Sequence, residues 1–169
     1  MLYNIQNIST KEVPLWGKND ILSYFNKECK TAEELRERAE LRLQLEKEMK
    51  SMNFPDTISF ILGKFNIKIT EITNVPGDSE CLSYRTFLRY KNSEIKVLSK
   101  RNVIAVCVSL GIPSFISNHV IENAGFSFGN TFEDSMFKII LETNVHETFE
   151  SINKMLVLNG LDPLTKKKS

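Results

Sequence analysis

The chain has 169 residues, and its 22 lysine and arginine residues nearly balance its 21 aspartate and glutamate residues. A chain of this length buries roughly 70% of its unfolded surface, so one compact domain with appendages needs neither disulfides nor metal to fold. The formal net charge of +1 neither indicates nor excludes a nucleic-acid partner, so only the local distribution of charge can decide.

The remaining composition favours a soluble cytoplasmic protein. The three cysteines, Cys29, Cys81 and Cys107, lie far apart and form no C-x-x-C pair. This spacing disfavours a disulfide framework and a cysteine zinc site, and it fits a reduced cytoplasmic setting. The longest apolar run, 103–112, is about half as long as a membrane span requires, and the first residues show no charged-then-apolar leader. We therefore expect no membrane association.

The sequence of residues 1–30 predicts an N-terminal arm followed by one short helix. The first 18 residues mix apolar and polar types without a clear period, and Trp16 is the expected anchor of this arm. Asp20 can cap a short helix that runs through Phe25. The side chains that this helix is expected to bury are Ile21, Leu22, Tyr24 and Phe25.

Residues 31–52 contain the clearest helix signal in the chain. Thr31 and Glu34 form a T-x-x-E capping box, in which each side chain accepts a hydrogen bond from the other residue's backbone N–H. Arg42 interrupts the apolar stripe of this helix, which consists of Leu35, Ala39, Leu45, Met49 and Met52. With about three heptads and a broken seam, an amphipathic helix packed on its own domain is favoured over a dimerising coiled coil. Both interpretations stay open, and the second predicts a homodimer through 31–52.

Short helical patterns separated by turn signals fill residues 54–164. The predicted helices cover 55–65, 83–90, 98–110, 115–123, 131–142 and 147–159. The segment 66–75 is compatible with a strand or a short helix, and the Pro-Gly-Asp sequence at 76–78 predicts a turn. Short helices joined by short turns make a compact all-α domain. We therefore predict a mainly α fold, a compact bundle of short helices preceded by one long amphipathic helix and followed by a basic tail at 165–169.

Positive charge is concentrated on and after the predicted helix at 83–90. Between residues 83 and 101 the only anion is Glu94, whereas the cations are Arg85, Arg89, Lys91, Lys96, Lys100 and Arg101. Phosphate attraction supplies most of the binding energy of a helix that reads duplex DNA, so such a cluster favours a nucleic-acid partner. The competing interpretation is an ordinary solvated face, which is common in a chain with 25% charged residues.

Several short motifs occur in a fixed order along residues 54–164. Four of them, L-S-Y-R-T-F-L-R, S-K-R-N-V, E-N-A-G-F-S-F and I-N-K-M-L, lie at 82–89, 99–103, 122–128 and 152–156, and a Pro-Leu pair follows at 163–164. This series resembles the phage repressor/Cro (XRE-type) helix-turn-helix domain, in a version from bacterial regulators that carries extra C-terminal helices. The resemblance covers about two thirds of the chain.

The resemblance implies a DNA-binding transcriptional regulator whose recognition helix spans about 83–90. In that family role, the residues that cap the helix and face the base edges are Ser83, Tyr84, Arg85 and Thr86. The residues that hold phosphates and set the register are Arg89, Lys91, Lys100 and Arg101. An arginine with two hydrogen bonds to guanine gives about 1–3 kcal/mol of discrimination, whereas phosphate contacts carry no sequence information. Double-stranded DNA is thus the expected partner.

One departure from the family pattern concerns the turn before the recognition helix. If 70–73 is the preceding short helix, about four extra residues are inserted around 76–78, and Thr73 stands where the family has alanine. An enlarged turn can tilt the recognition helix away from a major groove about 12 Å wide. The alternative function is therefore a non-catalytic protein-interaction module, such as an antitoxin-like or phage-encoded adaptor that binds a partner protein.

No catalytic constellation is visible in the sequence. His146 and Glu147 begin half of an H-E-x-x-H zinc motif, but Glu150 occupies the position of the second histidine. Cys81 and Cys107 are more typical of buried small side chains than of nucleophiles, and no glycine-rich phosphate loop occurs. We therefore expect neither an enzyme, nor a metal site, nor a cofactor.

Overall fold

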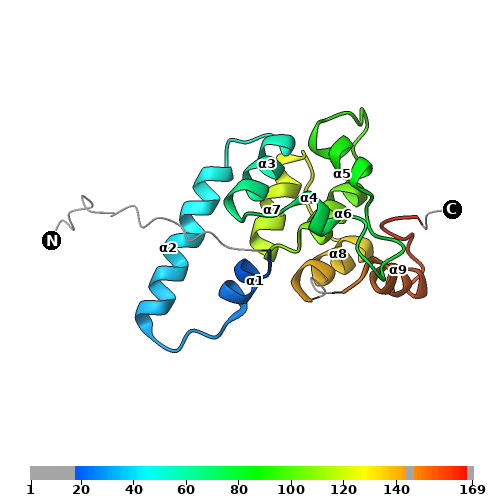
Figure 1. Ribbon diagram of the computed structural model, residues 1–169. Helices are drawn as coiled ribbons and strands as arrows, with labels where there is room; N and C mark the ends of the chain where they lie inside the picture. The colour runs from blue at the N-terminus through cyan, green and yellow to red at the C-terminus, as the bar shows by residue number, and fades with distance from the viewer. Residues whose placement is uncertain (1–17, 144–146, 167–169) are drawn as a thin grey trace.

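The computed structural model describes residues 18–143 and 147–166, and every regular element among them is an α-helix (Figure 1). The helices in chain order are α1 (Lys18–Asn26), α2 (Ala32–Met49), α3 (Phe54–Lys64), α4 (Ile69–Ile72), α5 (Tyr84–Lys91), α6 (Lys100–Leu110), α7 (Ser114–Asn123), α8 (Phe132–Thr143) and α9 (Phe149–Leu158). The predicted mainly α fold is confirmed. Among the residues that the structure describes, none of the helices has the length and apolar character needed to cross a membrane.

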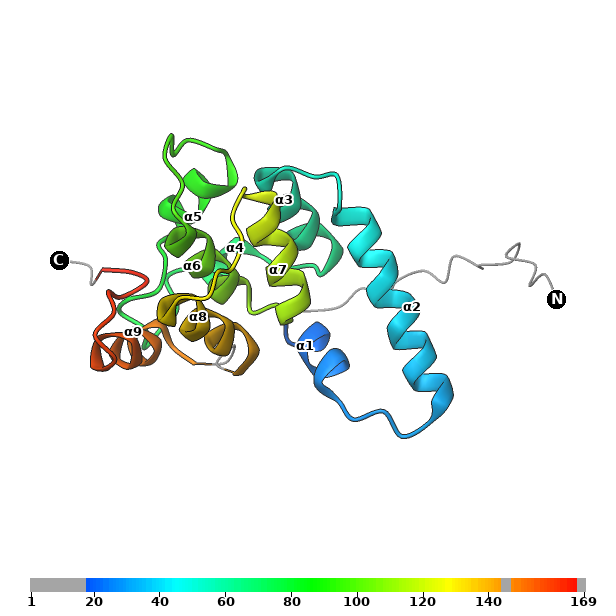
Figure 2. The same cartoon turned by 180° about the vertical axis from the view of Figure 1, so that it is seen from behind.

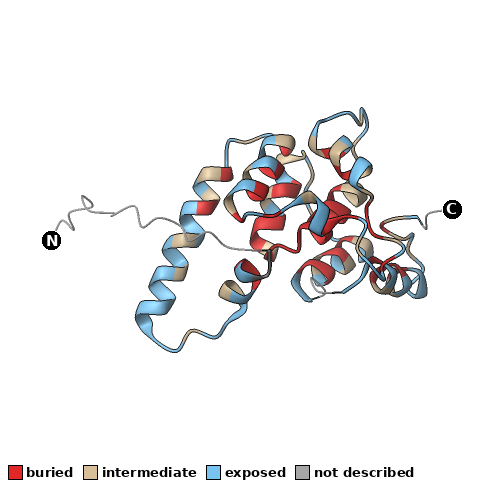
Figure 3. Ribbon diagram, in the orientation of Figure 1, coloured by how far each residue is buried: buried red, intermediate tan, exposed pale blue. Residues whose placement is uncertain are grey.

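Helix α6 forms the centre of the bundle. Its residues from 103 to 110 are all buried, and it packs against α7 and α8. Helix α3 packs against α5 and α7, and α4 contacts α5. The red segments in Figure 3 mark this shared core. Fully buried side chains such as Phe65, Phe87 and Phe137 each stabilise the fold by about 1.5–3 kcal/mol relative to exposure, so apolar burial is the main stabilising contribution.

Side-chain caps fix where several helices begin. The predicted capping box is present, because Glu34 N–H donates to Thr31 Oγ1 at 3.1 Å and Thr31 N–H donates to Glu34 Oε2 at 3.3 Å. Ser83, Ser99 and Thr148 accept a backbone N–H in the same way at the starts of α5, α6 and α9. Each such cap stabilises its helix by about 0.5–2 kcal/mol. The last helix consequently begins after Thr148 rather than at the predicted residue 147.

Helix α2 lies largely outside the core. It ends three residues before the predicted boundary at 52, and only Leu45 and Met49 on it are buried. Leu35 and Leu43 are 60% and 50% exposed, and Ala39 is exposed as well. Figure 3 shows the N-terminal turns of α2 in pale blue along their length, while its other end reaches the core. The predicted apolar stripe is therefore buried only in the last turns of the helix.

Helix α1 corresponds to the short helix predicted near the N-terminus. Ile21 and Leu22 are buried as expected, whereas Phe25 is half-buried. The ring of Phe25 meets the ring of Phe115 on α7 edge-on, with 4.8 Å between the ring centroids. Trp16 and most of the predicted arm lie outside the described residues. Figures 1 and 2 both place the α1–α2 pair at one end of the molecule and α5 toward the other.

The ambiguous segment 66–75 contains the single helical turn α4 and no strand. Thr73 closes this turn, since its hydroxyl donates to the carbonyl of Ile69 at 2.8 Å. The turn predicted at 76–78 is present: Asp78 N–H donates to the carbonyl of Val75 at 3.1 Å. Gly77 within it has a φ of 80°, a left-handed conformation that glycine adopts without steric cost.

Candidate nucleic-acid interface

Helix α5 carries the candidate interface. The Ser83 side chain accepts the backbone N–H of Thr86 at 3.1 Å, and the two hydroxyl oxygens lie 2.8 Å apart. Phe87 and Tyr90 are buried against the core, and this burial raises the pKa of Tyr90. The cap and the two aromatic anchors together fix which face of α5 is turned to solvent.

Arg85 and Arg89 lie on that exposed face. Residues four apart are neighbours on one side of a helix, and at 3.6 residues per turn this side lies opposite Phe87 and Tyr90. Both arginines are exposed, and neither makes a hydrogen bond or an ion pair with another residue in 18–143 or 147–166. Tyr84, in the first turn, is 42% exposed. The face thus presents two guanidinium charges that no carboxylate of the described chain neutralises.

Lys100 and Arg101 are held in a different way. Lys100 Nζ lies 2.8 Å from Asp134 Oδ1, and Arg101 pairs with Glu133. Arg101 also donates to the backbone carbonyl of Asp162. These contacts join the first turn of α6 to the first turn of α8 and to the segment after α9. The structure therefore brings together Arg85 and Arg89 but matches the charges of Lys100 and Arg101 within the protein.

Asp134 is the buried member of this network. The backbone N–H of Gly129 donates to Asp134 Oδ2 at 2.6 Å, and Asp134 N–H donates to Thr131 Oγ1 at 3.1 Å. Burial alone raises the pKa of Asp134, but the hydrogen bonds from Lys100 and Gly129 outweigh it and hold the pKa below its ordinary value of 3.8. The carboxylate is consequently charged at neutral pH, and its pair with Lys100 stabilises the contact between α6 and α8.

The connection between α4 and α5 is long, but it is closed at its base. Eleven residues, 73–83, separate the two helices, whereas a typical helix-turn-helix uses about 3–4. The N–H of Asn74 donates to the carbonyl of Leu82 at 3.1 Å, which brings the two ends of the connection together. Helices α4 and α5 contact each other. Residues 75–81 thus form a loop whose two ends meet, and α4 and α5 stay in contact.

Asp78 in this loop caps α9. Its carboxylate accepts the backbone N–H of Phe149 at 2.7 Å and that of Glu150 at 3.2 Å. Thr148 accepts the next free donor, Ser151 N–H, at 3.1 Å. The first turn of α9 therefore has an acceptor for each of these three donors, which a helix cannot satisfy internally. Nothing in the sequence around residue 149 indicates this cap, because Asp78 lies 71 residues before Phe149.

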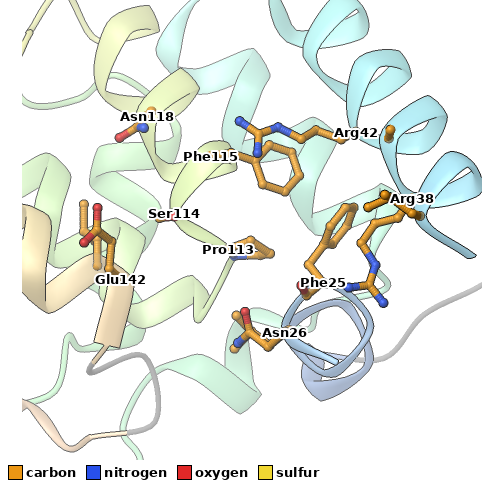
Figure 4. Close-up of a pocket in the computed structure, with 13 residues that line it drawn as sticks. Phe25, Asn26, Arg38, Arg42, Pro113, Ser114, Phe115, Asn118 and Glu142 are labelled. Atoms are coloured by element: carbon orange, nitrogen blue, oxygen red, sulfur yellow. Dashed lines mark hydrogen bonds between the residues drawn. The ribbon is translucent and has the colours of Figure 1, made fainter. Parts of the chain in front are cut away.

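A groove between the α1–α2 pair and helices α7 and α8 forms a second surface of interest (Figure 4). Its volume is about 410 Å³, and Leu35 lines it. The guanidinium of Arg38 lies 5.3 Å from the ring centroid of Tyr24, and that of Arg42 lies 4.7 Å from the centroid of Phe115. The groove thus combines an aromatic lining with a cationic wall.

Side chains suited to nucleophilic or metal chemistry are sparse in the part of the chain that the structure describes. No group of three or more histidine, cysteine, aspartate and glutamate residues there could hold a metal ion. Burial raises the pKa of Cys107 to about 12, and Cys81 is buried with its Sγ 3.1 Å from Val75 N. His146, from the half zinc motif, lies outside the described residues.

Comparisons of the chain with protein-family models, with curated proteins and with solved structures find no match. The resemblance to the repressor/Cro family therefore stays a prediction from short motifs. Functional inference depends instead on the geometry of α5 and of the residues that hold it.

Proposed function

We propose that this protein is a DNA-binding regulator that presents the first turns of α5 to the major groove of a duplex. The observation that carries this proposal is the pair Arg85 and Arg89, exposed on one face of a capped helix without a carboxylate partner. Such a guanidinium can exchange water for phosphate or guanine without first breaking an ion pair. The buried aromatic anchors on the opposite face keep the pair directed outward. Its three free cysteines suit a cytoplasmic location.

The roles along α5 follow from position. The first-turn residues that face base edges are Ser83, Tyr84, Arg85 and Thr86. Arg85 is the residue able to make two hydrogen bonds to guanine, worth about 1–3 kcal/mol of discrimination. Arg89 and Lys91, one turn or more later, contact phosphates and set the register.

Lys100 and Arg101 have no part in this proposed contact. Freeing Lys100 for a phosphate would leave the buried Asp134 carboxylate unpaired, and breaking a buried pair costs about 3–5 kcal/mol. An additional exposed phosphate contact does not offset that cost. Arg101 likewise forms an ion pair with Glu133 and donates a hydrogen bond to the Asp162 carbonyl.

The closed base of the α4–α5 connection also supports the proposal. An insertion that separated α4 from α5 would remove the support behind the recognition helix. The hydrogen bond between Asn74 and Leu82 keeps the two helices in contact despite the eleven-residue connection. The tilt expected from an enlarged turn is thereby limited.

The test is duplex binding by fluorescence anisotropy at several salt concentrations. Wild type should bind a labelled mixed-sequence duplex with a steep negative slope of log affinity against log salt. The double variant Arg85→Ala plus Arg89→Ala should flatten this slope by about 0.9 for each phosphate contact that it removes. Selection of duplexes from a random pool should identify the preferred sequence. Arg85→Ala alone should then lower the affinity for that sequence by about 5-fold to 150-fold, equivalent to 1–3 kcal/mol.

The matched control is Lys47→Ala plus Lys50→Ala, which removes two exposed cations from the α2 end of the molecule. It should bind as wild type does. Absence of duplex binding at low salt, or equal losses in the α5 variant and the control, would refute the proposal.

Protein binding through α2 is the second candidate function, and the exposed apolar side chains of α2 favour it. Leu35, which lines the groove with the aromatic lining, is 60% exposed, and Leu43 on the same helix is 50% exposed. A second copy of the chain, or a partner protein, would bury them. If the partner is a second copy, sedimentation should show a dimer for wild type. If it is another protein, pull-downs should recover that partner even after nuclease treatment. Leu35→Ser plus Leu43→Ser should abolish the complex, whereas Val97→Ser, at an apolar residue 82% exposed after α5, should preserve it.

A further inference from the structure

One flank of α2 is apolar and exposed over about three turns. Its side chains follow each other at spacings of three and four residues, which places them in one stripe on a helix: Ala32, Leu35, Ala39 and Leu43. All four are exposed. Leu45 and Met49, which anchor α2 to the core, lie roughly 100° away around the helix axis. Packing of α2 on its own domain therefore leaves the stripe uncovered by the rest of the described chain.

The stripe is symmetric about Ala39. A leucine lies four residues before it and another lies four residues after it. A two-fold axis beside Ala39 would run two copies of α2 antiparallel and bring Leu35 of each copy onto Leu43 of the other. The small side chain at the centre lets the two helix axes approach to about 8–10 Å. The stripe is thus complementary to a second copy of itself.

The charges on the outer flank of the stripe favour the antiparallel orientation. Arg36 and Glu40 have side chains that are 68% and 65% exposed. With the axis beside Ala39, Arg36 of one copy and Glu40 of the other lie about 3 Å apart along the helix direction, because each residue advances 1.5 Å. The acidic first turn with Glu33 likewise lies beside the basic last turn with Lys47. A parallel pair would instead place like charges opposite each other, which is destabilising.

The charges on the inner flank of the stripe are matched within the same copy. Arg38 donates to the carbonyl of Phe25 at 3.4 Å. The guanidinium of Arg42 lies over the ring of Phe115, and its Nε is 2.9 Å from Glu46 Oε1. Figure 4 shows Arg42 beside Phe115 and Arg38 next to Phe25. This flank therefore presents little free charge to repel a second copy.

We infer that two copies of the chain associate through α2, antiparallel, with the two-fold axis beside Ala39. The inference rests on the second candidate function, protein binding through α2, and identifies the partner as a second copy. The stripe is shorter than a standard interface, so the dimer is weak and reversible. Figures 1 and 2 place α2 at the end of the molecule away from α5, so this dimer leaves the arginine face of α5 accessible.

Single cysteines test the orientation. The background is Cys29→Ser, because the other two cysteines are buried, and the oxidant is oxidised glutathione. At an axis separation of about 8–10 Å, the two Cα atoms of residue 39 lie about 4–6 Å apart, within the range of a disulfide. Ala39→Cys should therefore form a covalent dimer.

The two leucine positions provide the matched comparison. Leu35→Cys should not cross-link with itself, because its two copies lie about 12 Å apart along the helix direction. It should cross-link with Leu43→Cys when the two proteins are mixed. Cross-linking of Leu35→Cys with itself would show a parallel pair and overturn the inference.

Charge reversal tests whether the contact joins two molecules. Sedimentation of wild type from about 10 µM to 1 mM should show a monomer–dimer equilibrium. Arg36→Glu alone and Glu40→Arg alone should each raise the dissociation constant about 10-fold, because like charges then meet at two symmetry-related places. An equimolar mixture of these two proteins should restore the wild-type value, since every contact between unlike copies again joins opposite charges. The control Lys154→Glu, at an exposed cation on α9, should dimerise as wild type does.

Three results would overturn the inference. Wild type could stay monomeric over this range, Arg36→Glu could dimerise as wild type does, or the mixture could remain as weak as its components. Capture of a different protein by monomeric wild type through α2 would overturn the inference and leave the second candidate function standing. The duplex assay with Arg85→Ala plus Arg89→Ala tests the α5 proposal separately, so either proposal can fail alone.

Discussion

Replacement of Asp78 tests whether the loop 75–81, which precedes α5, supports the fold. In the variant Asp78→Ala, the backbone donors of Phe149 and Glu150 lose their acceptor, and so does Glu80 N–H, which lies 3.3 Å from Asp78 Oδ1. Asp78 is only 6% exposed, so water does not readily replace the carboxylate. The variant Asp78→Asn keeps one acceptor oxygen but removes the charge.

The expected loss of stability follows from these contacts. A lost N-cap costs about 0.5–2 kcal/mol, and leaving a buried N–H without a partner costs about 1–3 kcal/mol. A carboxylate at a helix N-terminus contributes about 0.3–1 kcal/mol through the helix dipole. Because these contributions overlap, we expect about 2–4 kcal/mol for Asp78→Ala and about half of that for Asp78→Asn. For a chain of this length each kcal/mol corresponds to roughly 2–4 °C in Tm.

Urea unfolding followed by circular dichroism measures the loss directly. The midpoint should fall from wild type through Asp78→Asn to Asp78→Ala, with an unchanged dependence on denaturant. Asp162→Ala is the matched control, since its side chain is exposed and surface changes usually stay within about 0.5 kcal/mol. A loss for Asp78→Ala no larger than that of the control would show that the loop does not cap α9.

Two further predictions concern buried titratable groups. Asp134→Asn should destabilise the protein by about 2 kcal/mol at neutral pH, because Lys100 and Gly129 lose a charged acceptor. Since the native pKa of Asp134 lies below 3.8, its contribution is complete above that pH and disappears as pH falls through the native pKa. Urea unfolding of both proteins across pH should therefore show a narrowing gap in acid, and a gap independent of pH would contradict this. Burial raises the pKa of Cys107 to about 12, so this thiol should not react with an aromatic disulfide reagent at pH 8 until urea is added. Cys29 is only partly buried and should react in the native protein. Equal reaction rates of the two thiols in the native protein would contradict the burial of Cys107.

Local sequence signals predicted most of the fold. A capping box joins residues three positions apart, so Thr31 and Glu34 predict the start of α2 from a four-residue stretch of sequence. The serines at 83 and 99 mark α5 and α6 in the same way. Phe87 and Tyr90 lie three residues apart on α5, and both are buried against the core. These elements were predictable because each depends on residues close together in the sequence.

Charge matching could not be predicted, because it depends on distant residues. Lys100 and Arg101 belong to the same basic cluster as Arg85 and Arg89 in the sequence, but their carboxylate partners lie 34 and 32 residues further along the chain. Nothing within a helical turn of Lys100 indicates Asp134. Similarly, the apolar pattern of residues 31–52 does not indicate that only the last turns of α2 pack against the core. Of the eight predicted site residues, the proposed contact therefore leaves out Lys100 and Arg101 and keeps the N-cap Ser83 and the five residues on α5.

The residues around α5 separate into those that would contact DNA and those that hold the helix in place. Arg85 and Arg89 have no partners to lose within the described chain, so replacing them should change affinity and leave unfolding unchanged. Asp78 has no free surface to offer a ligand, so replacing it should change unfolding first and affinity only through the orientation of α5. If the arginine variant changes only DNA affinity and the Asp78 variant changes mainly stability, then α5 binds DNA through residues that do not stabilise the fold. If Arg85→Ala plus Arg89→Ala lowered stability as much as Asp78→Ala does, the two arginines would stabilise the fold, and the proposed DNA contact through them would be contradicted.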